Sequence, residues 1–174
     1  MTVAVPRRSS LPPPPAPEVS FRLELPLQPE WHNVDLLRLA ILNCLSAVFG
    51  DPDLSESVGI VTSELLENAI KYGNGGETRL SVEFDRIVNR VAIRMWNNAT
   101  AAHIETLKRN VQELSEASDA FAHYQEVMRR SAKRANGSGL GLARIAGEAE
   151  MSLSVTAEDG HVCVTAQTRP GATR

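Results

Sequence analysis

Alternation of apolar and polar side chains with a period of two marks five stretches of the chain, and this pattern predicts half-buried β-strands. The stretches are residues 20–25, 79–85, 91–95, 151–156 and 162–166. Pro26 is expected to end the first strand, because proline cannot donate a hydrogen bond to a neighbouring strand. Asp159 and Gly160 predict a tight turn with positive φ angles that joins the last two strands into a hairpin.

Apolar residues spaced three and four apart predict helices in the intervening stretches. The helical pattern runs from Pro29 to a stop at Gly50 and Pro52, from about Ser55 to Tyr72, through much of 101–136, and over 140–150. The second helix is predicted to bury an apolar row made of Val58, Val61, Leu65 and Ala69. Gly73 is expected to end this helix in the left-handed conformation that glycine adopts readily.

The order of these elements predicts a two-layer α/β (α+β) sandwich, in which helices cover one face of an antiparallel or mixed sheet. A length of 174 residues, with 43% hydrophobic and 22% charged residues, fits a single domain with a substantial core. We place this domain at residues 20–170. Residues 1–19 hold a proline-rich run that cannot form a helix or a sheet, so we expect a disordered tail there.

A polar row lies on the helix that ends near Gly73. Glu64 and Asn68 are four residues apart and share a face, with Lys71 and Tyr72 one turn further on. A magnesium-bound nucleotide needs such groups: a base for an attacking hydroxyl, an oxygen ligand for the metal and a cation for the phosphates. A solvated face is the commoner reason for a polar row, so this motif alone assigns no function.

A run of alternating glycines lies about seventy residues further on. It consists of Gly137, Gly139 and Gly141, with Leu140 and Leu142 following the second and third glycines. The run precedes a helical pattern, and unpaired backbone amides at the start of a helix bind phosphate, because the helix dipole also favours an anion there. Taken alone, such a run is equally typical of a flexible hinge.

Together, and in this order, the two motifs resemble those of the histidine-kinase-type ATPase superfamily, known as the GHKL or Bergerat fold. The resemblance extends over about residues 20–168. It implies that the chain binds ATP and Mg²⁺, that Glu64 is the catalytic base, and that Asn68 holds the metal. It also implies that Lys71 and the glycine run hold the phosphates, and that residues from about 100 to 138 form the lid over the nucleotide.

The sequence departs from this family at the end of its third predicted strand. Where the family has Asp-x-Gly, this chain has Asn97, Asn98 and Ala99. The family's aspartate accepts a hydrogen bond from the adenine amino group. The amide oxygen of Asn97 can accept the same bond, but without the charge that makes such a bond about twice as strong. If the third position requires a positive φ angle, Ala99 is strained by about 1 kcal/mol or more.

Four basic residues just before the glycine run form a cluster with more than one interpretation. They are Arg129, Arg130, Lys133 and Arg134. Their position suits contact with the β- or γ-phosphate of a nucleotide or with an acidic partner, whereas a basic run is also typical of a solvated surface.

Composition excludes several other classes of function. The formal net charge of −3 argues against direct nucleic-acid binding. No apolar run is long enough to cross a bilayer, so we expect no membrane partner. Cys44 and Cys163 lack metal-ligand spacing, and two lone thiols suit the reducing cytoplasm.

Among the superfamily, this chain is most similar in size to the anti-sigma-factor serine kinases and the SiaB-type threonine kinases of bacteria. Those proteins phosphorylate a small STAS-like antagonist and so switch its binding to a sigma factor or another effector. The resemblance therefore implies an ATP-dependent serine/threonine protein kinase with such partners, and a homodimer formed through the first strand and helix. Two alternatives stay open: a non-catalytic interaction module that keeps only the fold, and a detached histidine-kinase domain that acts on another protein's histidine.

Overall fold

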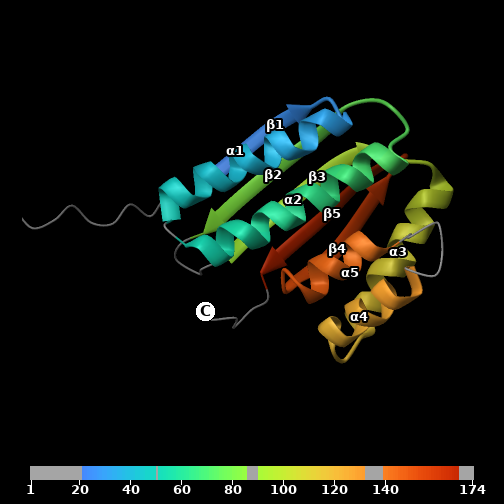
Figure 1. Cartoon of the computed structure of the whole chain (residues 1–174). Helices are drawn as coiled ribbons and strands as arrows, with labels where there is room; N and C mark the ends of the chain where they lie inside the picture. The colour runs from blue at the N-terminus through green and yellow to red at the C-terminus, as the bar shows by residue number, and fades with distance from the viewer. Residues whose placement is uncertain (1–20, 50, 86–89, 132–138, 169–174) are drawn as a thin grey trace, which may run out of the picture.

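The computed structural model describes residues 21–49, 51–85, 90–131 and 139–168, which form a five-stranded sheet and five helices (Figure 1). The strands are β1 (Phe21–Leu27), β2 (Thr78–Asp85), β3 (Arg90–Asn98), β4 (Met151–Glu158) and β5 (His161–Thr168). The helices are α1 (Trp31–Phe49), α2 (Pro52–Tyr72), α3 (Ala101–Glu116), α4 (Ala120–Ser131) and α5 (Leu140–Gly147). The tail predicted at residues 1–19 lies outside the described residues.

The sheet is antiparallel throughout the described chain. Its strands lie in the order β1-β2-β3-β5-β4, and each neighbouring pair is antiparallel. The helices pack on one face of this sheet, as Figure 1 shows. The predicted two-layer α+β sandwich is therefore confirmed, and of the two sheet types predicted the sheet is the antiparallel one.

The core lies between α2 and the inner face of the central strands. The four apolar residues predicted to face inward on α2 are each at most 3% exposed. They belong to one buried cluster with Ile93, at the centre of β3. Ile93 pairs with Val82 on β2 and with Ala166 on β5, and all three are fully buried. Burial of each large apolar side chain favours the fold by about 1.5–3 kcal/mol, so this contact fixes α2 across the middle of the sheet.

Helix α2 begins earlier than its apolar pattern indicates, because its first turn is capped. The Asp51 side chain accepts a hydrogen bond from the backbone N–H of Leu54 at 2.9 Å. Pro52 occupies the first turn, where its missing N–H would have no partner within the helix. The cap adds one turn to the N-terminal end of the helix that carries the predicted site.

The other end of α2 stops at Gly73, but not in the predicted conformation. Gly73 has φ −63° and ψ 144°, which is extended, so the prediction of a left-handed closure is wrong. Glycine is needed there for a different reason. A β-carbon at this position would lie 2.3 Å from the carbonyl oxygen of Ala69, which accepts a hydrogen bond from the Gly73 N–H.

Two further sequence predictions concern the strands. Asp159 and Gly160 have φ angles of 48° and 80°, which confirms the tight turn between β4 and β5. Strand β1 continues through Pro26 to Leu27, so the prediction that Pro26 ends it is wrong. Because β1 lies at the edge of the sheet, it tolerates a residue that lacks a hydrogen-bond donor.

The long stretch predicted to be helical and to form a lid contains two helices, α3 and α4. Ile104, Val111 and Leu114 of α3 are buried, in agreement with their spacing. Helix α4 has no buried residue among those described and packs against α5. The approach is close at Gly147, where a β-carbon would lie 2.7 Å from the β-carbon of Tyr124.

Candidate functional site

A pocket opens between α2, the ends of β3 and β5, α3 and the start of α5. The pocket is partly open to solvent. Its walls are mainly apolar and include Leu65, Ala69, Met95, Leu107, Val162 and Val164. Apolar walls of this kind suit the flat faces of an aromatic base, and the polar groups between them can fix its orientation.

Asn68 and Gly139 line this same pocket, although they are 71 residues apart in the sequence. Asn68 lies on α2, whereas Gly139 is the residue before α5 and has a φ of 92°. No side chain caps the start of α5, so backbone N–H groups of its first turn have no partner within the helix. The pocket therefore combines an amide side chain with a helix N-terminus that favours anions.

The other members of the glycine motif differ in their placement. Leu142 lines the pocket and is 4% exposed. Leu140 begins α5 and is partly exposed, but it does not line the pocket. Gly141 lies against the carboxylate of Glu64, since a β-carbon there would lie 2.3 Å from Glu64 Oε2. Gly137 lies outside the described residues.

Asn97 stands where the pocket meets the end of β3, and it is 8% exposed. Its side-chain nitrogen donates a hydrogen bond to the carbonyl oxygen of Asn98 at 2.9 Å. This bond uses the amide as a donor toward its own strand, so the amide oxygen is the group left to accept a bond from a ligand. Ala99 also lines the pocket and has no positive φ angle, so the strain considered for this position does not arise.

Helix α3 supplies polar groups that the sequence motifs did not identify. His103, Thr106 and Asn110 line the pocket opposite α2. The ring of His103 lies 5.2 Å from that of Tyr72, centre to centre, and this pair closes one side of the pocket. The distance in sequence between α3 and α2 does not indicate that they face each other across a pocket. The one sequence feature that could have pointed to these residues is their position beside the buried row of α3.

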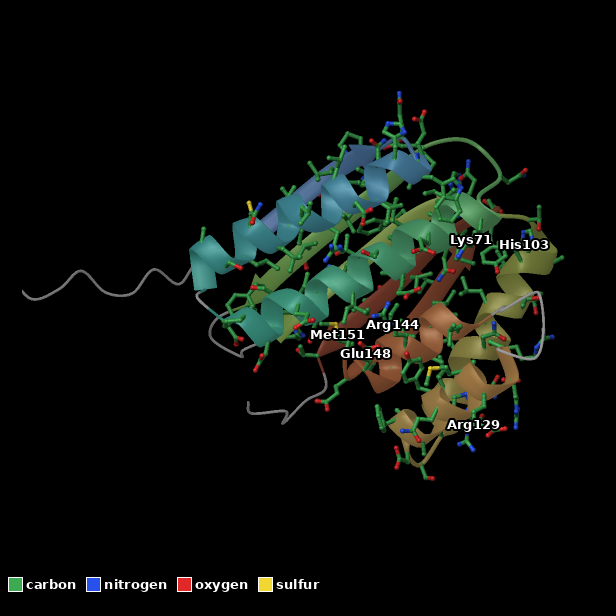
Figure 2. The ribbon with its side chains drawn as sticks, viewed as in Figure 1. Lys71, His103, Arg129, Arg144, Glu148 and Met151 are labelled. Carbon is green, nitrogen blue, oxygen red and sulfur yellow. The ribbon has the colours of Figure 1, made fainter. Side chains whose placement is uncertain are left out.

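Glu64 lies one helical turn from Asn68 but does not line the pocket. Its side chain is 16% exposed, and its Oε1 accepts a hydrogen bond from Nη1 of Arg144 at 3.2 Å. Arg144 in turn contacts Glu148, the residue that follows α5, and Figure 2 shows the two side by side. Arg144 was not among the candidate residues, because nothing in its spacing to Glu64 indicates this contact.

Burial dominates the electrostatics of Glu64. Desolvation raises the pKa of its carboxyl above the ordinary value for glutamate, and the hydrogen bond from Arg144 opposes that rise. The nearby charge of Glu67 raises the pKa further, whereas Lys71 lowers it. A glutamate with a raised pKa accepts a proton more readily than an exposed one, which is the property expected of a general base.

Lys71 does not line the pocket. Its ammonium pairs with Glu67 at 2.9 Å and lies 5.4 Å from the centre of the Trp31 ring on α1. Figure 2 shows Lys71 and His103 at the same end of the molecule, but on different elements. The phosphate contact predicted for Lys71 stays a prediction, and this arrangement does not favour it. Among the described lining residues there is no lysine or arginine.

The basic cluster lies partly outside the described residues. Arg129 and Arg130 both pair with Glu126 on their own helix, α4. Lys133 and Arg134 belong to the residues that are not described. Within the described ranges no group of three or more His, Cys, Asp or Glu side chains could hold a metal. The assignment of Asn68 as a ligand of Mg²⁺ stays a prediction.

The predicted fold, a sheet with helices on one face, is confirmed by its likeness to a solved structure. The structure is similar to the crystal structure of the SiaB–SiaC complex from Pseudomonas aeruginosa, with a TM-score of 0.65 and 18% sequence identity. The match covers 84% of this chain and 88% of the matched chain in that complex. At this identity the likeness shows a shared fold.

The sequence itself matches no family model and no curated protein. Over the described residues, no helix has both the length and the apolar character needed to cross a membrane.

Proposed function

We propose that this protein binds Mg-ATP and transfers the γ-phosphate to a serine or threonine of a small STAS-like partner protein. The observation that carries the proposal is the placement of Asn68, Gly139 and Asn97 in the lining of one pocket. A nucleotide site needs an oxygen ligand for the metal, a helix N-terminus for the phosphates and a hydrogen-bond acceptor for the nucleobase. The similarity to the SiaB–SiaC complex supports a protein partner.

Each residue has a defined part in this proposal. The adenine ring lies between the apolar walls of the pocket, and its amino group donates a hydrogen bond to the side-chain oxygen of Asn97. Asn68 binds Mg²⁺, which neutralises part of the phosphate charge when it is bound. The first-turn amides of α5, next to Gly139, hold phosphate oxygens. Glu64 accepts the proton of the attacking hydroxyl.

A non-catalytic interaction module is the second candidate. The separation of Glu64 from the pocket and its ion pair with Arg144 favour this alternative. Against it, a domain that only docks a partner has no physical need for an open apolar pocket lined by the amide side chains of Asn68 and Asn97. A cytoplasmic location, which the free thiols of Cys44 and Cys163 suit, is part of either proposal. Phosphohistidine on the partner, which acid destroys, would instead indicate a detached histidine kinase.

Replacement of the proposed metal ligand tests nucleotide binding directly. In Asn68→Ala, calorimetric titration with Mg-ATP is expected to show affinity lower by roughly ten- to a hundredfold, because a hydrogen bond or ligand bond to a charged group contributes about 1.5–3 kcal/mol. Asn43→Ala, an exposed change on α1, should bind like the wild type. Absence of binding to the wild type up to millimolar Mg-ATP would favour the non-catalytic module.

The orientation of the Asn97 amide predicts which base is bound. With its nitrogen bonded to the Asn98 carbonyl, the Asn97 oxygen is proposed to face the nucleobase, where it would meet an amino group in ATP but a carbonyl in GTP and ITP. We expect GTP and ITP to bind about ten- to a hundredfold more weakly than ATP, since two facing acceptors leave a buried group unpaired at a cost of about 1–3 kcal/mol. Asn97→Leu should weaken ATP binding and bring the three affinities together. If the wild type bound ATP, GTP and ITP with equal affinity, the proposed contact between Asn97 and adenine would be contradicted.

A further inference from the structure

A chain of polar contacts joins three helices beside the proposed site. Arg144 Nη1 on α5 donates to Glu64 Oε1 on α2 at 3.2 Å. The same guanidinium donates twice to Glu148, with Nε to Oε2 at 2.7 Å and Nη2 to Oε1 at 3.4 Å. The Tyr124 hydroxyl on α4 donates to Glu148 Oε2 at 3.4 Å. The contacts therefore run from the proposed base, through one arginine, to α4.

Glu64 is confined by its surroundings. One carboxylate oxygen accepts from Arg144, while the other lies so close to Gly141 that a β-carbon there would require the carboxylate to move. Its side chain is 16% exposed, so an isolated charge at this place would be costly and the carboxyl would tend to stay protonated. Among the described residues, the charged and titratable groups around it are Glu67 and Lys71 on its own helix, Arg144 on α5, Glu148 just after α5, and Tyr124 on α4.

Arg144 is the group that supports the charged form of Glu64 through a direct hydrogen bond. Lys71 lowers the pKa of Glu64 only through space, and its ammonium pairs with Glu67. The guanidinium is itself fixed, since Glu148 contacts it through two of its nitrogens. Arg144 and Glu148 are 39% and 37% exposed, so their ion pair adds little to stability. Its main consequence is the fixed position of the guanidinium beside Glu64.

We infer that Arg144 is a positioning residue for the proposed phosphoryl transfer: its guanidinium holds the Glu64 carboxylate ionised and in place against Gly141. The inference rests on the proposed function, because it gives Glu64 the part of the base. Arg144 does not line the nucleotide pocket, so it acts through Glu64 and not through the nucleotide.

The step that Arg144 supports is a simple displacement. The hydroxyl oxygen of the acceptor serine or threonine forms a bond to the γ-phosphorus of ATP, while the bond from that phosphorus to the oxygen bridging to the β-phosphorus breaks. The hydroxyl proton passes to Glu64, and ADP leaves with the electron pair of the broken bond. Glu64 can accept the proton only if it begins ionised, which is the condition that Arg144 maintains.

The test measures the charge of Glu64 directly. With carboxyl-¹³C-labelled glutamate, NMR titration of the intact chain gives the pKa of Glu64, whose signal is assigned by its loss in Glu64→Gln. In Arg144→Met, which removes the charge and keeps the aliphatic stem, the pKa of Glu64 is expected to rise above the wild-type value. Arg144→Lys should restore part of the difference. Arg129→Met, on the exposed side of α4, should change nothing, because Arg129 pairs within its own helix.

Calorimetry on the same variants separates this inference from the proposed function. Arg144→Met should bind Mg-ATP within about twofold of the wild type, a difference of less than 0.5 kcal/mol. A pKa for Glu64 that is unchanged or lower in Arg144→Met would overturn the inference, as would loss of Mg-ATP binding equal to that of Asn68→Ala. A wild type that binds no Mg-ATP would overturn the proposed function, while the dependence of the Glu64 pKa on Arg144 would still be measured.

Discussion

Glu64→Gln is expected to lower the rate of phosphoryl transfer by about 10²–10⁴-fold, because the amide cannot accept the proton of the attacking hydroxyl. Affinity for Mg-ATP should stay near that of the wild type, since Glu64 does not line the pocket. The rate is measured as ADP release from Mg-ATP, with water as the acceptor or with the partner protein captured by the intact chain. A lowered rate at unchanged affinity is the result that distinguishes a base from a nucleotide ligand.

Glu67→Gln is the matched control for this change. Glu67 lies on the same helix, carries the same charge and pairs with Lys71 outside the pocket, so its loss should leave the rate nearly unchanged. If Glu64→Gln turned over Mg-ATP as fast as the wild type does, Glu64 would not be the base. If the wild type bound Mg-ATP but yielded neither ADP nor phosphoprotein, the non-catalytic module would be the better description.

Ile93→Ala is expected to lower the free energy of unfolding by about 2–5 kcal/mol, the range for removal of a fully buried aliphatic side chain. Ile93 is 0% exposed at the centre of β3, where it packs in the same cluster as Leu65 of α2. The loss combines the transfer of apolar surface with a cavity that the surrounding sheet cannot close. In a chain of this size each kcal/mol lowers the melting temperature by about 2–4 °C.

Urea unfolding of the same variant should give a lower midpoint with an unchanged slope, because the surface exposed on unfolding stays the same. Leu36→Ala on α1 is the control, since Leu36 is 62% exposed and its change should alter stability by no more than about 0.5 kcal/mol. Equal losses for the two variants would show that β3 and α2 do not form the core described above.

Much of the fold could be read from local periodicity. The strands and helices follow from alternation with periods of two and of three to four, because each element must turn one face toward the core. Those periods placed the inward row of α2 correctly, and the Asp-Gly pair at residues 159 and 160 correctly predicted the hairpin turn. They failed at the ends of elements: β1 runs through Pro26, and Gly73 is extended. Ends depend on caps and edge positions, which periodicity does not encode.

The candidate site was determined only in part by the sequence. Glu64, Asn68 and the glycine run could be named because a helix fixes the spacing of its own side chains, and because a glycine run before a helix is recognisable locally. The tertiary structure alone decided that Asn68 and Gly139 share a pocket, that α3 supplies its opposite wall, and that Lys71 faces Trp31 instead. It also decided that Arg144 meets Glu64, 80 residues earlier in the chain. The physical reason is that partners across helices are chosen by how the helices pack on the sheet, and spacing along the sequence does not specify that packing.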